Sequence, residues 1–208
     1  AVVLKPSEMT PFSAVRLAEL AVQAGVPAGL FNVVQGDGRT TGDALTRHPL
    51  IAKMTFTGST RTGAAIMASC ALQGPKPVTL ELGGKSPLII TDDADLDIAV
   101  TVAVEQFDNA GQVCLSGTRF LVQRGIAEKF KAAFIERAKQ IKQGDPRDEA
   151  TDIGPQIHPE HFTRVKGFVD RAVAEGQTVV LGGGPNAELG GNFFMPTLID
   201  NPKVGSEI

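Results

Sequence analysis

Cys114 and Glu81 are the two side chains of this sequence whose types could carry covalent chemistry. A thiolate is a strong nucleophile towards a carbonyl carbon and a good acyl carrier, and Cys114 follows a predicted helix and a glycine turn in NAGQVCLSGTR. Glu81 lies between Leu80 and Leu82, and an apolar environment would raise its pKa towards the range of a general base. The residues alone leave both roles open, since Cys114 could be a small buried hydrophobe and Glu81 a strand residue facing water.

Glycine-rich turns follow two predicted strands and could hold the phosphates of a cofactor. Gly36, Gly38 and Gly42 follow the strand FNVVQ, and Gly58 ends a strand just before a helix that is expected to begin at Ser59. Free backbone N–H groups and the positive end of a helix favour an anion at such a turn. Each could equally be an ordinary tight turn or helix cap, but two of them at carboxyl ends of strands in one sheet favour a cofactor site.

Lys5 and Glu8 lie in KPSE, just past the first predicted strand and at the same edge of the sheet. An ammonium and a carboxylate could bracket two adjacent ribose hydroxyls, although a solvated turn would use the same residues. Because a carboxylate repels a 2′-phosphate, the pair favours NAD over NADP as the cofactor.

The cysteines and histidines support neither a disulfide nor a metal site. Cys70 lies among alanine and methionine on a predicted helix and is expected to be a structural thiol. The two cysteines belong to no C-x-x-C pair, which predicts a reduced, cytoplasmic compartment. His48, His158 and His161 form no ligand cluster with either cysteine, so no metal is predicted.

Composition narrows the functional classes. The net charge of −3 and the hydrophobic content of 42% are ordinary for a soluble globular protein. No basic stripe is present, which argues against nucleic-acid binding. The apolar runs are too short for a membrane span, and the N-terminus lacks the pattern of a secretory signal.

Strands and helices alternate along the chain, which predicts an α/β fold with a parallel, doubly wound sheet. Strands are expected at 1–7, 30–36, 52–58, 78–84, 86–92, 118–123, 178–184 and 193–199, and helices at 10–25, 40–49, 59–71, 93–107, 127–141 and 160–176. The first helix is expected to take Thr10 as its N-cap and to stop at Gly25. Residues 144–159 are expected to form a long polar loop. The chain contains two successive series of alternating strands and helices, which meet near residues 80 to 85. We therefore expect two domains, residues 1–82 and 83–208.

Five stretches, in order along the chain, resemble the aldehyde dehydrogenase superfamily: KPSEMTP, GVPAGLFNVVQGDG, FTGSTRTG, LELGGKSP and NAGQVCLSGTR. The resemblance covers the whole chain with matching spacing. It implies a Rossmann-like parallel-sheet NAD(P)-binding domain over residues 1–82 and an α/β catalytic domain over residues 83–208, both incomplete. Branches that pass the acyl group to coenzyme A generally lack a general base here. The presence of Glu81 therefore favours the non-acylating branch, which forms a carboxylic acid.

The resemblance also implies a role for each matching residue. Cys114 would attack the aldehyde to form a thiohemiacetal, and after hydride transfer to NAD(P)⁺ Glu81 would activate the water that hydrolyses the thioester. The backbone N–H of Cys114 would be half of an oxyanion hole. The residues expected around the cofactor are Lys5, Ser7, Glu8, Gly38, Gly42, Phe56, Thr57, Gly58, Ser59, Leu82 and Gly83.

The aldehyde pocket is expected to be shaped by Asp108, Val113 and Leu115, which flank the nucleophile. Relatives often have an aromatic residue in place of Asp108. The acid therefore suggests a polar or amino-bearing aldehyde, unless Asp108 is only an exposed residue at a helix end.

Other parts of the family pattern have no match in these 208 residues. They are an upstream PWN asparagine that completes the oxyanion hole, a downstream E-x-F-G-P glutamate that holds the nicotinamide ribose, and an oligomerisation hairpin. We therefore expect a fragment of a longer chain, which as a whole forms a homodimer or homotetramer. The fragment should be nearly inactive, since losing one oxyanion donor costs about 10²–10³ in rate.

Two further classes of protein remain as alternatives. One is a non-catalytic cofactor-binding or scaffold protein on the same fold, and the other is a thioester-forming hydrolase without redox chemistry. The presence of both Cys114 and Glu81 argues against a scaffold. The set of Lys5, Glu8 and Ser59 argues against a hydrolase that uses no cofactor.

Overall fold

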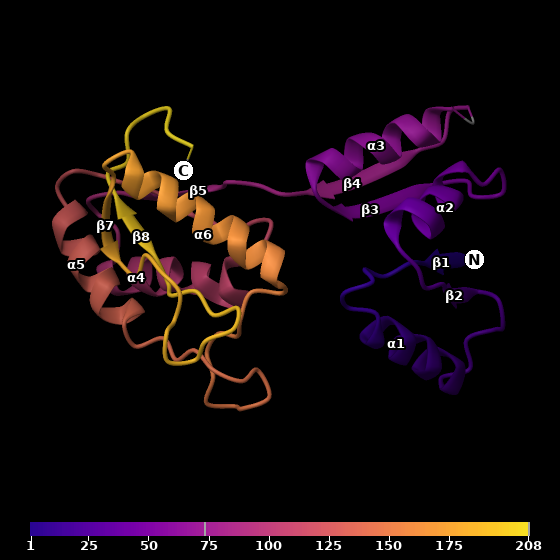
Figure 1. Ribbon diagram of the computed structural model, residues 1–208, viewed down its shortest axis with the longest axis horizontal. Coiled ribbons are helices and arrows are strands. Elements are labelled where there is room, and N and C mark those ends of the chain that lie inside the picture. The colour runs from indigo at the N-terminus through magenta and orange to yellow at the C-terminus, as the bar shows by residue number, and fades with distance from the viewer. Residues whose placement is uncertain (73, 208) are drawn as a thin grey trace. The chain divides into compact units, whose positions relative to one another are not determined.

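A computed structural model describes residues 1–72 and 74–207 of the chain (Figure 1). The chain divides into two compact units, Ala1–Gly83 and Gly84–Ile208. Each unit mixes helices with short paired strands, and three of the four strand pairs among the described residues are parallel. The predicted α/β fold class, with a Rossmann-like arrangement in the first unit, is confirmed.

The first unit contains two parallel strand pairs. Strand β1 (Val2–Leu4) pairs with β2 (Phe31–Val33), and β3 (Met54–Gly58) pairs with β4 (Val78–Leu82). Its helices are α1 (Phe12–Gln23), the π-helical turn η1 (Gly38–Gly42), α2 (Asp43–Arg47) and α3 (Thr60–Ala71). Because both pairs are parallel, the turns that follow these strands leave from carboxyl ends, where α/β folds place their ligands.

The ends of the helices in this unit test the predicted caps. Ser59 is the N-cap of α3, as expected, and its hydroxyl accepts a hydrogen bond of 3.2 Å from the Thr62 N–H. Gly25 follows α1 with a left-handed φ of 82°, which confirms it as the stop of that helix. The prediction of Thr10 as N-cap is wrong. The helix begins at Phe12, so Pro11, whose side chain has no hydrogen-bonding group, holds the N-cap position, and the Thr10 N–H donates to the Ser7 carbonyl in the preceding turn.

The second unit contains one parallel and one antiparallel strand pair. Strand β5 (Pro87–Ile90) runs parallel to β6 (Arg119–Val122), and β7 (Thr178–Leu181) runs antiparallel to β8 (Leu198–Asp200). Its helices are α4 (Leu96–Val104), the 3₁₀ segment η2 (Glu105–Gly111), α5 (Ala127–Ala138) and α6 (Pro159–Ala174). Between α5 and α6 the chain forms a long loop, as predicted, tied back by a bridge between Gln143 and Ile153.

An aromatic core holds the second unit together. Phe134 is fully buried, and its ring stacks on Phe130 with 5.9 Å between centroids and meets Phe120 edge-on at 5.2 Å. Both α4 and α5 pack into this core through their apolar faces, joined at the surface by Arg137, which donates to the Thr101 hydroxyl at 2.8 Å. Within the described ranges, no helix has both the length and the apolar character needed to cross a membrane.

Candidate active site

The predicted turn and strand-end residues of the first unit meet at one edge of the β3–β4 pair. The register places Gly58 beside Leu82 and Thr57 beside Glu81. Residues 56–59 and 81–83, which lie far apart in the sequence, therefore lie side by side at the carboxyl end of the pair. This edge is where a parallel α/β sheet presents its ligand-binding turns.

The turn after β3 has a glycine at position 58, where a larger residue would meet a neighbouring side chain. A side chain on Gly58 would collide with the ring of Phe56, which lies over the backbone at this point. The Ser59 hydroxyl caps α3 and also donates to the Thr62 hydroxyl at 2.9 Å. The N–H groups of the first turn of a helix have no acceptor within the helix, so the start of α3 remains suited to an anion.

Lys5 and Glu8 also lie together, at the carboxyl end of β1. The Lys5 ammonium donates to the carbonyl oxygens of Pro6 at 2.6 Å and Gly36 at 2.7 Å, and lies 3.8 Å from the Glu8 carboxylate. Its stem passes Gly42, where an added Cβ would lie 3.8 Å from the Lys5 Cε. Two segments that the sequence analysis treated separately, KPSE and the glycine turn, thus form one cluster.

Ser7, predicted near the cofactor, shapes the turn that presents this cluster. Its hydroxyl accepts a hydrogen bond of 3.2 Å from the Met9 N–H. The bond holds the backbone of the KPSE turn, and the Ser7 side chain is exposed.

Asp37 fills the anion position at the glycine turn. Its carboxylate accepts hydrogen bonds from the N–H groups of Arg39 at 2.8 Å and Thr40 at 2.9 Å, and from the Thr40 hydroxyl at 2.7 Å. The Thr40 hydroxyl and the two backbone donors lower the pKa of Asp37. The tight-turn interpretation therefore describes the start of η1, and the N–H groups of Arg39 and Thr40 are already used. The sequence signal was present, since aspartate is a preferred N-cap.

Glu81 does not have the environment predicted for it. Side chains alternate along β4, and Leu80 and Leu82 both face α3, where an added Cβ on Gly63 would lie 2.9 Å from Leu82 and 3.4 Å from Leu80. Glu81 points to the opposite face and is exposed. The predicted desolvation of this carboxylate is wrong because its apolar neighbours lie on the other side of the strand.

Cys114 is exposed, whereas Cys70 is 1% exposed. The alternative of Cys114 as a buried hydrophobe is therefore wrong, and Cys70 is confirmed as the buried thiol. The backbone of Gly84 runs against the Cys114 loop, since a Cβ on Gly84 would lie 2.8 Å from the Cys114 carbonyl oxygen. Cys114 lies in the second unit and Glu81 in the first.

A left-handed run of backbone leads into the Cys114 loop. Asn109, Ala110 and Gly111 have φ values of 50°, 56° and 75°. This conformation is routine for glycine and tolerated by asparagine, but it costs other residues about 1–2 kcal/mol. The Gln112 side chain closes the turn, because its amide donates to the Asn109 carbonyl at 2.9 Å.

The three predicted pocket residues flank this loop in different ways. The Asp108 carboxylate accepts a hydrogen bond of 2.7 Å from the Asn109 N–H, so it caps the turn while remaining exposed. Val113 is half-buried and Leu115 is 75% exposed. Asp108 therefore fits the interpretation of an exposed acid at a helix end.

Lys85 is a residue near the Cys114 loop that the sequence analysis did not single out. Its ammonium donates to the Thr118 hydroxyl at 2.9 Å and so ties the strand entry beside Gly84 to the exit of the Cys114 loop. Burial, together with the neighbouring Arg119 charge, lowers the pKa of Lys85. Its place in LELGGKS was the available signal, but a lone lysine in a turn is usually solvated.

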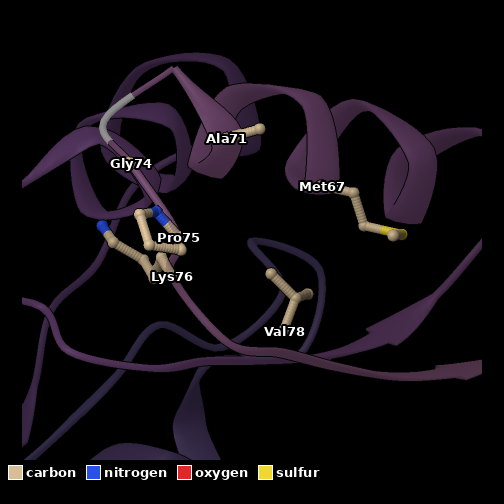
Figure 2. Close-up of a pocket in the computed structure, with 6 residues that line it drawn as sticks. All are labelled: Met67, Ala71, Gly74, Pro75, Lys76 and Val78. Carbon is tan, nitrogen blue, oxygen red and sulfur yellow. The ribbon is translucent and has the colours of Figure 1, made fainter.

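A hollow of the first unit lies at the other end of the β3–β4 pair. It has a volume of about 500 Å³, and Figure 2 shows the residues that line it: Met67, Ala71, Gly74, Pro75, Lys76 and Val78. The Lys76 ammonium is held by the carbonyl oxygens of Thr46 and His48. This hollow is at the amino end of β4, away from the predicted turns. Across residues 1–72 and 74–207, no group of three His, Cys, Asp or Glu side chains is arranged to hold a metal.

Comparison with known proteins gives one consistent result. The sequence pattern of the Aldehyde dehydrogenase family matches residues 1–208. A solved NADP-dependent enzyme from E. coli is 44% identical with a TM-score of 0.93, over 98% of this chain and 42% of that one. A betaine aldehyde dehydrogenase from Staphylococcus aureus in complex with NAD⁺ is 42% identical with a TM-score of 0.91, over 98% and 41%.

A third solved structure, an NAD-dependent aldehyde dehydrogenase from Sinorhizobium meliloti, is 40% identical with a TM-score of 0.92. The match covers 96% of this chain and 40% of that one. The chain thus spans about two fifths of the length of the solved structures that it resembles.

Proposed function

Because the chain belongs to the aldehyde dehydrogenase family, we propose that the protein oxidises an aldehyde to a carboxylic acid with NAD(P)⁺ and uses Cys114 as its nucleophile. The observation that carries this proposal is the contrast between the two thiols. Cys70 is buried in a helix. Cys114 is exposed on a loop that follows a left-handed turn, and the hydrogen bond from Lys85 to Thr118 holds the exit of that loop. A merely structural cysteine needs no such presentation.

The residues of the first unit fit a dinucleotide. The Lys5 ammonium has three N–H donors, two of which go to backbone carbonyls, and with the exposed Glu8 it would hold the adenosine ribose. The start of α3 after Ser59 would receive the pyrophosphate, and Leu82 and Gly83 would border the nicotinamide. Glu8 favours NAD, while the likeness to an NADP-dependent enzyme keeps NADP as the second candidate.

The chemistry then follows from two side chains. The Cys114 thiol loses its proton to solvent, and its Sγ forms a bond to the aldehyde carbon, giving a thiohemiacetal whose oxyanion the Cys114 N–H stabilises. NAD(P)⁺ held beside Leu82 and Gly83 would supply the hydride acceptor, so that Cys114 would be left carrying the acyl group as a thioester. Glu81 takes a proton from water, the water oxygen bonds to the acyl carbon, and the C–S bond breaks to release the carboxylic acid and the thiol.

The same proposal extends to substrate and assembly. The aldehyde would be a small molecule shaped by Val113 and Leu115, with Asp108 at the rim favouring a polar or amino-bearing chain. We place the protein in the reducing cytoplasm, as a full-length homodimer or homotetramer. A non-catalytic scaffold on the same fold is the alternative, and the exposed thiol argues against it.

The deciding experiment measures NADH formation by the full-length protein with a panel of aldehydes. Cys114→Ala should abolish turnover, and Glu81→Gln should stall with an acyl group on Cys114 that intact-mass spectrometry detects. Cys70→Ala is the matched control and should keep turnover. The 208-residue chain alone should have little activity, since it spans 42% of the first relative's length. Turnover that survives Cys114→Ala would overturn the mechanism.

A further inference from the structure

We propose that Gln156 is a positioning residue for Cys114: its side-chain amide holds the carbonyl of Ala110, and with it the left-handed run that turns the chain into the thiol loop. The inference rests on the proposed function in taking Cys114 as the nucleophile. Gln156 lies in the long loop between α5 and α6, a segment to which the sequence assigned no role.

Gln156 is buried and anchored at both its backbone and its side chain. It is 5% exposed, its N–H donates to the Asn192 carbonyl at 3.0 Å, and its Nε2 donates to the Ala110 carbonyl at 3.0 Å. A buried amide is costly unless it is hydrogen-bonded, so this contact fixes the Ala110 carbonyl against the body of the second unit. Ala110 itself is half-buried and lies near the end of η2.

The next residue reinforces the same connection. The Ile157 N–H donates to the Gln112 Oε1 at 3.0 Å, and the Nε2 of that side chain donates to the Asn109 carbonyl at 2.9 Å. The pair Gln156–Ile157 therefore holds the left-handed run at its centre and, through Gln112, at its start. Both contacts cross more than forty residues of sequence, at separations of 46 and 45.

The run needs an external support because its own backbone preference opposes it. Ala110 has a φ of 56°, a conformation that alanine adopts rarely. Without the Gln156 bond, the backbone at Ala110 would relax towards right-handed angles and would swing the chain that carries Cys114 four residues later. Nucleophilic attack needs the reacting atoms about 3–3.5 Å apart, and a misplacement of roughly 1 Å can cost about a hundredfold in rate.

An unpaired atom makes the role testable without unfolding the protein. Among the described residues, the Gln156 Oε1 is buried and has no hydrogen-bond partner. Gln156→Met keeps the length of the side chain but removes both the donor and this unpaired acceptor. The substitution leaves the Ala110 carbonyl without its donor, which lowers the free energy of unfolding, and removal of the unpaired acceptor offsets part of that cost. A denaturation curve of the variant, measured beside its kcat, then separates loss of positioning from loss of fold.

The experiment compares Gln156→Met with Gln143→Met in the full-length protein. Gln143 is the matched control, because its amide also donates to a backbone carbonyl of the second unit, that of Phe194 at 2.9 Å, away from the Cys114 loop. In Gln156→Met, hydrogen exchange over residues 107–118 should rise about tenfold as local opening becomes easier. The kcat should fall about 10- to 100-fold while the KM changes less than about twofold. Gln143→Met should change neither readout.

The possible outcomes separate the two proposals. Unchanged exchange and kcat in Gln156→Met would overturn the role of Gln156, and so would an equal loss in Gln143→Met. If Cys114→Ala kept its turnover, the proposed function would fail, while the exchange measurement would still decide whether Gln156 holds the loop. If Gln156→Met does not fold, Gln156→Asn carries the same test, because its shorter side chain cannot reach the Ala110 carbonyl.

Discussion

The two units of the chain differ in how many of their hydrophobic side chains they bury. The second unit buries Phe130 and Phe134 in an aromatic core and presents Cys114 from a loop attached to that core. The first unit carries the predicted cofactor turns, yet among its described hydrophobic residues only Ala14 and Cys70 are buried. Its apolar side chains instead remain at the surface, as on α1, where Phe12 is 85% exposed and Val22 is 73% exposed.

Under the proposed function, this difference matches what each site would have to hold. A nucleophile must be fixed to within a fraction of an ångström, which a close-packed core can provide. Cofactor turns present backbone groups at strand ends, and local bonds such as those of Ser59, Asp37 and Lys5 are enough to shape them. Parallel strand pairs are stable only when both faces are covered. The first unit buries fewer of its described hydrophobic side chains than the second unit does.

The largest change in the free energy of unfolding is expected from a substitution in the aromatic core of the second unit. Phe134→Ala should lower the free energy of unfolding by about 3–5 kcal/mol, since it removes a fully buried ring and leaves a cavity. Leu17→Ala in α1, at a side chain that is 53% exposed, should cost less than about 0.5 kcal/mol. The sequence has no Trp or Tyr, so denaturant unfolding is best followed by circular dichroism. Equal costs would contradict the difference between the units.

A smaller effect is expected in the turn that carries Cys114. Ala110→Gly should raise the free energy of unfolding by about 0.5–1 kcal/mol, because glycine adopts the left-handed conformation without steric cost. The same substitution at the exposed Ala132 inside α5 should lower it by about 1 kcal/mol. Opposite signs in matched denaturation curves would verify the strained turn, whereas two losses of similar size would contradict it.

Much of the scaffold could be predicted from sequence because local rules decide it. Alternating apolar runs gave the strand pairs, Gly25 ended a helix, and Ser59 capped one. The wrong predictions have separate causes. The cap prediction at Thr10 was one residue too early, since α1 begins at Phe12 and Pro11 is its N-cap. Glu81 was judged by its sequence neighbours, although the pleat of β4 turns them to the opposite face.

The support of the Cys114 loop could not be predicted in the same way. The left-handed angle at Ala110 contradicts the preference of alanine, and the residue that holds it, Gln156, lies 46 positions away in a loop without periodicity. Contacts of this kind arise from the packing of whole segments. A single sequence contains no local signal for them, which is why the loop was predicted as polar and featureless.

The smallest expected effect concerns the stability in acid of the long loop between α5 and α6, which contains Asp145 and Arg147. The Asp145 carboxylate accepts hydrogen bonds from the Arg147 side chain and N–H, which lower its pKa to about 2 from an ordinary value of 3.8. A carboxyl group with a lowered pKa in the folded state stabilises the protein above its unfolded value, and that contribution disappears as the pH falls through the folded one. The effect should be small because both side chains are exposed, Arg147 at 89% and Asp145 at 48%, and solvent screens them.

Asp145→Asn should therefore weaken the second unit slightly near neutral pH and less near about pH 2, where about half of the wild-type Asp145 carboxyl groups are protonated. Urea midpoints measured by circular dichroism between about pH 5 and pH 2 should show a shallower acid dependence in the variant than in the wild type. Asp37→Asn is the counterpart in the first unit, where the carboxylate caps η1. If only Asp145→Asn alters the transition of the second unit, the two units unfold as separate bodies. A shared response to both variants would mean that they unfold together.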